Sequence, residues 1–356
     1  MKKHNFSAGP SILPKVVFEQ AAQGVLDLDG SGLSVLEISH RSDTFVNIFE
    51  ETRSTVRELM GLSDDYHVLF LSGGATSQFF MTAMNLLDEH ETGAYIDTGT
   101  WSTKAVKEAK LFGKVEMVAS SNDRDYSYVP KDWKVSDDAK FLHLTTNNTI
   151  YGTQFHKIPE VNVPIIADMS SDIFSKPMDT SNMGVIYAGA QKNMGPAGTT
   201  LVIVRDDMLN RVERTIPTVL DYRSHIAKKG LLNTPPVFPI YVCMLNLRWL
   251  KSMGGVEAMA QRNEAKAKLL YNEIDANPCF VGKAVVEDRS MMSATFLMND
   301  TSLESEFMRV CDAAGIIGVK GHRSVGGFRA SMYNAMELES VQVLVDVMKD
   351  FGRKFG

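Results

Sequence analysis

The sequence has few cysteines and no long hydrophobic run. Its 356 residues contain only Cys243, Cys279 and Cys311, whose spacing supports neither a disulfide framework nor a zinc cluster. We therefore expect free thiols in a reducing cytosol. No window approaches the roughly 18 apolar residues of a membrane-spanning helix, and Lys2 and Lys3 are not followed by the apolar stretch of a signal peptide. We expect a soluble, cytoplasmic protein with no membrane partner.

A surplus of positive charge is also missing. The chain has 37 Lys and Arg against 43 Asp and Glu, a formal net charge of −6, so we expect no nucleic-acid partner. It contains no G-x-x-x-x-G-K-[ST], no complete G-x-G-x-x-G, no H-E-x-x-H and no G-x-S-x-G. The signatures of the common nucleotide, dinucleotide, zinc-protease and serine-hydrolase sites are therefore absent, and we expect no resident metal.

What the sequence does contain is an alternation of predicted helices and strands. Helical spacing of apolar residues predicts helices over 14–30 and 43–60. The short apolar runs that predict strands are 67–72, 93–99, 115–120, 140–146, 163–168, 184–189 and 199–204. This alternation predicts an α/β fold with a mostly parallel sheet that is buried on both faces.

The last third of the chain has a different pattern. A long amphipathic helix is predicted over 255–277, and strand-like runs follow at 293–299, 316–320 and 328–334. A length of 356 residues, at about 150 residues per domain, favours two domains. We predict a large domain over 1–254, which includes the N-terminal segment, and a small α+β domain over 255–356.

Three chemical features lie at predicted strand ends. SGGATSQ (72–78) turns from a strand into a helix, where free N–H groups can hold a phosphate, although a tight turn with a helix cap has the same pattern. Asp168 ends the strand over 163–168, where turn or capping residues are common. Lys192 follows the run 184–189 in apolar, glycine-rich surroundings that are unusual for a surface lysine.

Together these features match the needs of pyridoxal phosphate. A lysine forms a Schiff base with its aldehyde, a carboxylate keeps its ring nitrogen protonated, and a strand-to-helix turn holds its phosphate. Trp101 follows the strand over 93–99 and is available to stack on the ring, although core packing is the commoner fate of tryptophan. Because ligand groups gather at the carboxyl ends of parallel strands, we expect these residues to form one site.

Five segments resemble the phosphoserine aminotransferase family, a class-V, fold-type I group of pyridoxal-phosphate enzymes. They occur in the family's order and spacing over essentially the whole chain: FSAGPSILP (6–14), ISHRS (38–42), YAGAQKNMGPAG (187–198), NTPPVF (233–238) and GHRSVGGFRASMYNAM (321–336). The resemblance implies a fold-type I transferase, in which a large domain holds a mostly parallel seven-stranded sheet between helices and a smaller α+β domain closes the chain.

The resemblance also implies a reaction. The family transfers the amino group of L-glutamate to 3-phosphohydroxypyruvate, which gives O-phospho-L-serine and 2-oxoglutarate in serine biosynthesis. Some bacterial members also act on the phosphohydroxythreonine intermediate of pyridoxine biosynthesis.

The resemblance further implies roles for matching residues. Lys192 is the Schiff-base lysine and the general base and acid, Asp168 pairs with the pyridine nitrogen, and Trp101 stacks on the ring. The other implied cofactor-binding residues are Ala75, Thr76, Thr149, Gln191, Asn233 and Thr234. Because the last two reach the cofactor phosphate of the partner subunit, the resemblance implies a homodimer with shared active sites. The GGAT turn lacks an arginine that some members carry there.

Phosphoserine carries a carboxylate at one end and a phosphate at the other, so its site needs two separated anion clamps. Arginine suits both because its planar fork binds carboxylate and phosphate bidentately. By resemblance, Arg329 holds the α-carboxylate. The implied cluster for the distal phosphate, and for the side-chain carboxylate of glutamate, is His40, Arg41, His322 and Arg323. From the residues alone, His-Arg pairs beside turns are also typical of exposed surface.

Several alternatives remain open. Another fold-type I aminotransferase with a different acidic substrate, or a lyase, would use the same cofactor residues. A desulfurase needs a mobile catalytic cysteine, and none of the three cysteines has a suitable context. A binding module that kept the fold without catalysis would have no chemical use for Lys192, Asp168 and both clamps.

Overall fold

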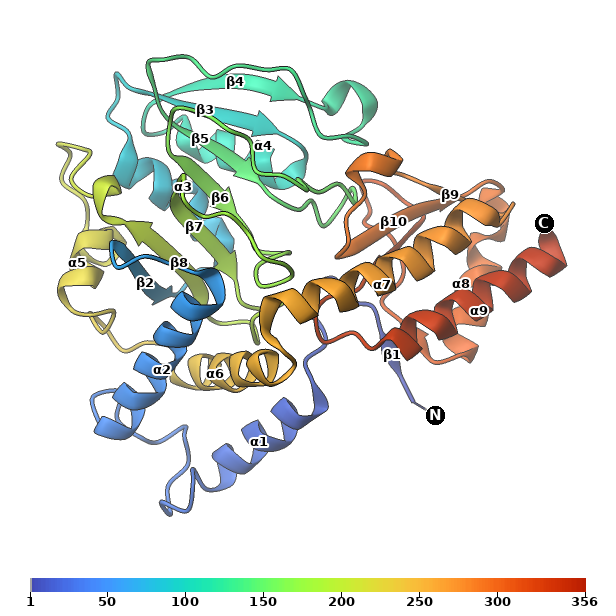
Figure 1. Cartoon of the computed structure of the whole chain (residues 1–356), viewed down its shortest axis with the longest axis horizontal. Coiled ribbons are helices and arrows are strands. Elements are labelled where there is room, and N and C mark those ends of the chain that lie inside the picture. Colours follow the sequence, from blue (N-terminus) through green and yellow to red (C-terminus); the bar gives the residue numbers. More distant parts are fainter. Residues whose placement is uncertain (1) are drawn as a thin grey trace.

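The computed structural model describes residues 2–356 and shows one large sheet beside two small ones (Figure 1). The large sheet has seven strands in the order β2-β8-β7-β6-β5-β3-β4. Their bounds are β2 Tyr66–Leu71, β3 Thr92–Asp97, β4 Lys114–Ser120, β5 Ala139–Thr145, β6 Ile165–Asp168, β7 Met183–Gly189 and β8 Thr200–Arg205. Strand β8 is antiparallel to β2 and β7, and the other neighbours are parallel. The predicted mostly parallel sheet and its strands are confirmed.

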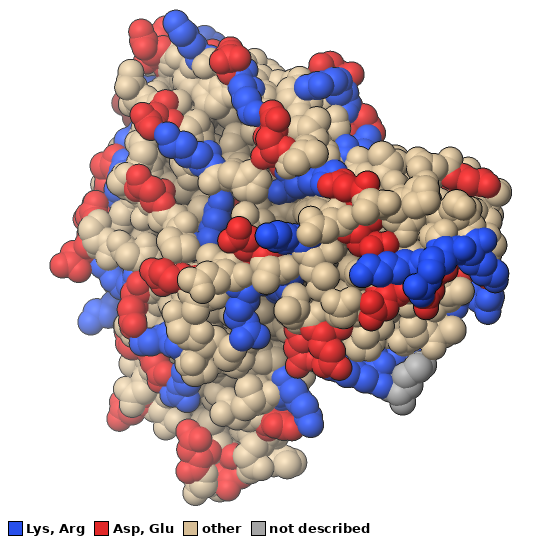
Figure 2. Space-filling model, turned by 45° about the vertical axis from the view of Figure 1, so that its right-hand side comes forward, with Lys and Arg blue, Asp and Glu red and all other residues tan. Residues whose placement is uncertain are grey.

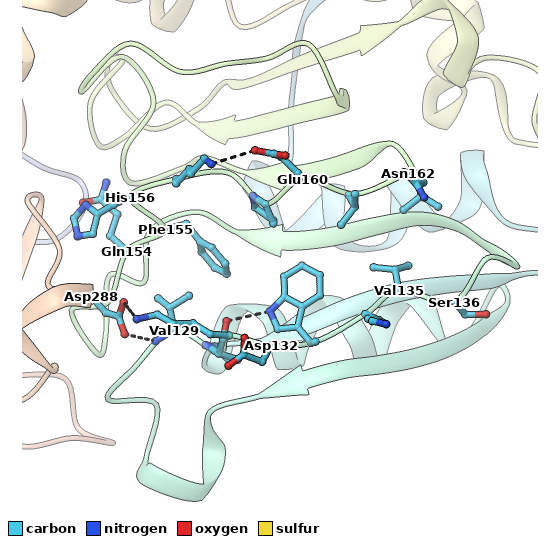
Figure 3. A pocket seen from close by; sticks show the side chains of 18 of the residues that line it. Val129, Asp132, Val135, Ser136, Gln154, Phe155, His156, Glu160, Asn162 and Asp288 are labelled. Carbon is cyan, nitrogen blue, oxygen red and sulfur yellow. Dashed lines mark hydrogen bonds and ion pairs between the residues drawn. The ribbon is translucent and has the colours of Figure 1, made fainter.

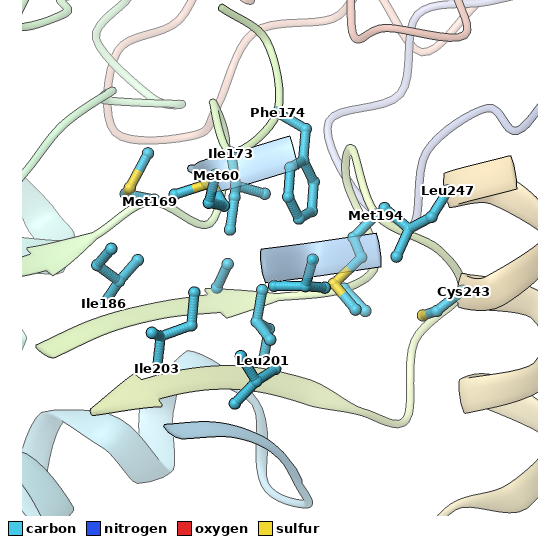
Figure 4. Packing of buried hydrophobic residues seen from close by; sticks show 14 of the residues in the cluster. Met60, Met169, Ile173, Phe174, Ile186, Met194, Leu201, Ile203, Cys243 and Leu247 are labelled. Atoms are coloured by element: carbon cyan, nitrogen blue, oxygen red, sulfur yellow. The ribbon is translucent and has the colours of Figure 1, made fainter. Parts of the chain in front are cut away.

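Helices cover both faces of this sheet. Successive side chains of its strands point to opposite faces, and apolar side chains occur on both. On one face, Ile186 packs in a cluster with side chains of α2 (Asp43–Met60) and α6 (Val237–Ser252) (Figure 4). On the other face, the next residue, Tyr187, packs with α3 (Gly74–Leu86) and α4 (Thr100–Ala109). Helix α1 (Lys15–Leu26) lies against α6, and α5 spans Tyr222–Ala227. The helices predicted over 14–30 and 43–60 are confirmed.

The C-terminal elements have an apolar cluster of their own, rich in phenylalanine. The elements are α7 Gly255–Ala276, β9 Phe280–Gly282, β10 Ser293–Met298, α8 Glu304–Ala313, β11 Ile316–Ile317, β12 Phe328–Ser331 and α9 Leu338–Phe355. Strands β12, β10 and β9 form an antiparallel sheet. The N-terminal strand β1 (His4–Asn5) pairs with β11, and Phe6 packs in the same cluster. The N-terminal segment therefore lies with the C-terminal elements.

The surface carries both signs of charge. Lys and Arg side chains intermingle with Asp and Glu over the face drawn in Figure 2. Within residues 2–356, no helix combines the length and the hydropathy needed to span a bilayer, and no cluster of potential metal ligands occurs. The three cysteines are free and buried.

Candidate active site

A cavity of about 290 Å³ lies where strands β5, β6 and β7 end. Thr145 and Asp168 close two of these strands, and Lys192 follows the third by three residues. The predicted site residues that line this one cavity are Ala75, Thr76, Trp101, Thr149, Asp168, Gln191, Lys192, His322 and Arg329. The carboxyl ends of parallel strands thus bring together residues that are far apart in the sequence.

Five predicted residues do not line this cavity within the single chain. Asn233 lines a neighbouring cavity with Ser72 and Ser77, at the start of α3, and Thr234 follows it. His40 and Arg41 lie just before α2, where the Arg41 Nε donates to His40 Nε2 at 3.4 Å. Arg323 is exposed next to His322. Their roles in binding stay predictions.

The first turn of α3 forms one wall of the cavity. Gly73 caps this helix with a φ of 103°, and a Cβ on Gly73 would lie only 1.7 Å from the Ser77 hydroxyl oxygen. Only glycine fits such a backbone. The turn therefore presents free N–H groups of Gly74, Ala75 and Thr76 near the cavity, together with the positive end of the helix dipole, and both favour an anion.

Asp168 is buried at the end of β6. Its Oδ1 accepts a hydrogen bond of 3.0 Å from the Ser170 N–H, and the Ser170 Oγ accepts one from the Gly189 N–H at the end of β7. Burial raises the pKa of Asp168, while the Ser170 bonds and the charge of Lys192 act in the opposite direction. A cationic partner, such as a protonated ring nitrogen, would favour the ionised carboxylate.

Lys192 is the basic group of the cavity. Its Nζ donates to Thr149 Oγ1 at 2.8 Å. Burial lowers the pKa of Lys192 to about 8, opposed by the charge of Asp168 and reinforced by that of Arg329. An amine with this pKa is partly unprotonated near neutral pH, so Lys192 can act as a nucleophile and as a base.

The backbone around Lys192 is fixed from several sides. The Ser11 hydroxyl donates to the Lys192 main-chain oxygen, and the Ser11 N–H donates to that of Gln191. The next residue, Asn193, donates to Ile173 O and accepts from the Asn334 N–H. These bonds join the lysine loop to the N-terminal segment, to the turn after β6 and to the chain after β12.

Positive charge gathers at the other side of the cavity. Arg329 is half-buried, and its Nη1 donates to Thr149 O at 3.2 Å, while its Nε has no hydrogen-bond partner in residues 2–356. Burial lowers the pKa of Arg329. Burial also lowers the pKa of His322, as do the nearby charges of Arg329, Arg323 and Lys104, in that order. An anion at this position would be favoured by all of these groups.

Several polar residues of this cavity were not predicted from the sequence: Ser170, Ser171 and Asn147. The Asn147 Nδ2 donates to Ser171 Oγ, whose hydroxyl donates back to Asn147 O. The only sequence signal was their position directly after strands β5 and β6, which short polar residues of ordinary turns have as well.

Comparison with known proteins identifies the family. Residues 3–344 match the family model described as aminotransferase class-V. A phosphoserine aminotransferase of Flavobacterium psychrophilum is 56% identical over 355 residues, which cover 99% of this chain and 100% of the relative.

The chain belongs to the class-V aminotransferases.

Solved structures of class-V aminotransferases agree with this assignment. The phosphoserine aminotransferase from Bacillus circulans subsp. alkalophilus has a TM-score of 0.97 at 43% identity, covering 100% of this chain and 99% of its own. The PLP-bound enzyme from Trichomonas vaginalis has a TM-score of 0.93 at 38% identity, covering 98% of this chain and 100% of its own. The resemblance to the phosphoserine aminotransferase family and the predicted fold class are confirmed.

Pyridoxal phosphate is the cofactor of these aminotransferases, and the residues of the cavity fit it. The α3 turn supplies N–H groups for a phosphate, and Asp168 and Lys192 supply a carboxylate and an amine within the same cavity. Two buried polar atoms there, Trp101 Nε1 and Thr145 Oγ1, have no partner among the described residues. Gly9 also lies close to Lys192, since a Cβ added to this glycine would be 3.5 Å from the Cγ of Lys192.

Proposed function

We propose that this class-V, pyridoxal-phosphate-dependent transaminase moves the amino group of L-glutamate to 3-phosphohydroxypyruvate. The products are O-phospho-L-serine and 2-oxoglutarate, as in serine biosynthesis. One observation carries the proposal: Lys192 and Asp168 face the same cavity as Arg329 and His322, so a cofactor site and an anion site adjoin. The names of the relatives, which are similar over their full length, support the same substrate.

The bound cofactor would supply an aldehyde carbon that links to amines and a ring that accepts electrons. Lys192 would hold it covalently through Nζ, Asp168 would hold a proton on the ring nitrogen, and Trp101 would cover the ring face. Once displaced by the substrate amine, Lys192 Nζ would remove the proton from the substrate Cα. In the cofactor-free chain its pKa of about 8 already lies in the range of a base that works near neutral pH.

The two ends of the substrate would meet different cations. Arg329 would bind the α-carboxylate bidentately, and the His322–Arg323 pair would bind the distal phosphate or the glutamate side-chain carboxylate. His40 and Arg41 would complete this second clamp from the partner subunit, just as Asn233 and Thr234 would reach the partner's cofactor phosphate.

A homodimer with shared active sites is part of the proposal. Its support is a stretch of exposed apolar side chains that leads toward His40 and Arg41: Val16, Phe18, Leu26, Leu33 and Leu36. Burial of this stretch by a second copy would remove apolar surface from water, and it would carry the His40–Arg41 pair to the other copy.

Mixing two inactive variants tests the shared site directly. Lys192→Ala and Arg41→Ala each disable one contribution, and a heterodimer of the two would contain one site with neither change. We expect the mixture, after exchange of subunits, to recover about a quarter of the wild-type activity, because half of the dimers are mixed and half of their sites are intact. Activity that stays at the level of the separate variants would refute shared sites.

Three finer points belong to the same proposal. The phosphohydroxythreonine intermediate of pyridoxine biosynthesis is charged at the same two ends as phosphoserine, so we include it as a second substrate. We place the protein in the cytoplasm, for which its three free thiols offer support. We also keep the division into residues 1–254 and 255–356, which the separate apolar cluster of the C-terminal elements supports, although β1 and Phe6 pack with those elements.

Kinetics with paired keto acids test the substrate. We expect 3-phosphohydroxypyruvate to exceed hydroxypyruvate in kcat/KM by about 100-fold or more, because the clamp would be left without its anion. Equal values for the two keto acids would keep the transaminase and reject the phosphorylated substrate.

A further inference from the structure

A second buried acid lies behind Asp168 and has no part in the proposed reaction. Asp172 is 1% exposed and lies in the turn that follows β6. Its Oδ2 accepts a hydrogen bond of 3.2 Å from Gln154 Nε2, and its Oδ1 accepts one of 2.5 Å from the Thr146 hydroxyl. A buried carboxylate is costly unless its oxygens are hydrogen-bonded in this way.

Thr146 connects this acid to the strand that carries Asp168. Its N–H donates to Asp168 O at 3.0 Å, and its hydroxyl oxygen lies 3.1 Å from the same carbonyl oxygen. The hydroxyl has one proton, which it can give either to Asp172 or to Asp168 O. When Asp172 is ionised, its carboxylate accepts a hydrogen bond from the Thr146 hydroxyl. When Asp172 is protonated, it donates to the Thr146 oxygen, and the hydroxyl is then free to donate to the main-chain oxygen of Asp168.

Asp172 also acts through its charge. Burial lowers the pKa of Lys192, and the negative charge of Asp172 opposes this as the smallest of the four contributions. The pKa of Asp172 itself is raised to about 6, by burial first and by the charge of Asp168 least. The other charged group that faces it is Lys176, whose amine donates to His156 O at 3.0 Å. A neutral asparagine of the same shape could still accept from Gln154, but toward Thr146 it would donate where the carboxylate accepts.

Gln154 holds the Asp172 carboxylate from the side that faces the C-terminal elements. Its Nε2 donates inward to Asp172, and its Oε1 accepts from the Met291 N–H of the C-terminal elements. Figure 3 shows Gln154 at one end of a wide surface groove of about 790 Å³, close to Asp288. Because both ends of the Gln154 amide are engaged, it cannot turn its oxygen toward Asp172 without losing Met291.

We propose that Asp172 is a positioning residue of the cofactor site, which acts through Thr146 on the carboxyl end of β6 and through its charge on Lys192. This inference rests on the cofactor part of the proposed function and not on its substrate. Asp172 neither lines the cavity nor forms a hydrogen bond with Lys192, so its effect must pass through other residues or through its charge.

The test compares Asp172→Asn with wild-type protein loaded with pyridoxal phosphate. Asparagine can donate from Nδ2 to Thr146 and accept from Gln154, so it imitates the protonated acid and is expected to fold. Loss of the negative charge lowers the pKa of a nearby cation. We therefore expect the midpoint of the pH titration of the bound cofactor's visible absorption to move down by about half a pH unit or more.

Further variants separate positioning from general damage. Thr146→Val removes a donor from Asp172 and should move the midpoint in the same direction, whereas Thr146→Ser keeps the hydroxyl and should match wild type. Asp288→Asn is a matched control, because Asp288 is also buried and hydrogen-bonded, to the Val129 N–H, but its charge is not among those that shift the pKa of Lys192. Its midpoint should stay at the wild-type value.

Two results would overturn the inference. One is an Asp172→Asn protein that binds the cofactor with a midpoint within about 0.2 pH units of wild type. The other is a Thr146→Val protein with the wild-type midpoint. This second result decides the matter if Asp172→Asn does not fold. A wild-type protein that binds no cofactor would instead refute the proposed function itself, so the two failures are distinct.

Discussion

Thr149 contacts both Lys192 and Arg329, through different oxygens. Its hydroxyl accepts from Lys192 Nζ at 2.8 Å, and its main-chain oxygen accepts from Arg329 Nη1 at 3.2 Å. The residue follows β5 in a buried segment, so its position is set by the sheet. One threonine thus holds the proposed catalytic amine and the proposed carboxylate clamp in a fixed relation.

Removal of the Thr149 hydroxyl should therefore affect the chemical step more than folding. For Thr149→Val we expect kcat to fall by about 10-fold or more, because Lys192 loses the acceptor that orients its amine. Thr149→Ser, which keeps the hydroxyl, should stay close to wild type. Steady-state kinetics of both variants check this, and an equal loss in the serine variant would assign the effect to packing.

Lys192→Met should separate activity from stability. We expect turnover to fall by about a thousandfold or more, because the base and covalent anchor are lost. The cofactor-free variant should be more stable than cofactor-free wild type at pH 7, since the buried ammonium is gone.

The pH dependence of that difference has a definite sign. The pKa of Lys192 is about 8 in the folded chain against 10.5 ordinarily, so the unfolded chain binds more protons between these values. Wild-type stability should rise over that range through this group, and the advantage of Lys192→Met should shrink. Urea denaturation at pH 7 and pH 10 measures the difference in the free energy of unfolding between Lys192→Met and wild type. A difference that is the same at both pH values would contradict the assigned pKa.

Asp168→Asn should also lower turnover without loss of stability. Burial raises the pKa of this carboxyl, so its ionised form destabilises the cofactor-free fold at neutral pH. We expect a melting temperature at or above that of wild type, together with a drop in kcat of about 100-fold or more. Thermal melts and kinetics of the same preparation check both, and a clearly lower melting temperature would contradict the account.

Arg329→Lys should weaken the binding of both amino acids. A lysine keeps the charge but loses the planar fork, so we expect KM for glutamate and for phosphoserine to rise together by about 10-fold or more. A change confined to one substrate would mean that Arg329 does not hold the carboxylate that the two have in common.

Most predicted strands were close to the observed ones because their apolar runs are buried on both faces, as in the run that became β7, whereas the edge strand β4 has no buried residue. Periodicity could not show that β1 pairs with β11, since a two-residue strand has no pattern and its pairing joins opposite ends of the chain. The placement of Lys192 and Asp168 in one cavity was predictable, because both lie at the carboxyl ends of parallel strands. Asp172 follows Asp168 by only four residues, but its role depends on Thr146 and Gln154, which only the fold brings to it.

An absorption spectrum of the protein loaded with pyridoxal phosphate examines the cofactor, Lys192 and the substrate in one experiment. It should be recorded before and after O-phospho-L-serine and, separately, L-glutamate are added. We predict a visible band from the cofactor on Lys192 that both amino acids shift to the near ultraviolet, as each donates its amino group. A band that glutamate shifts and phosphoserine leaves unchanged would contradict the proposed substrate, and no visible band at all would contradict the assignment of Lys192.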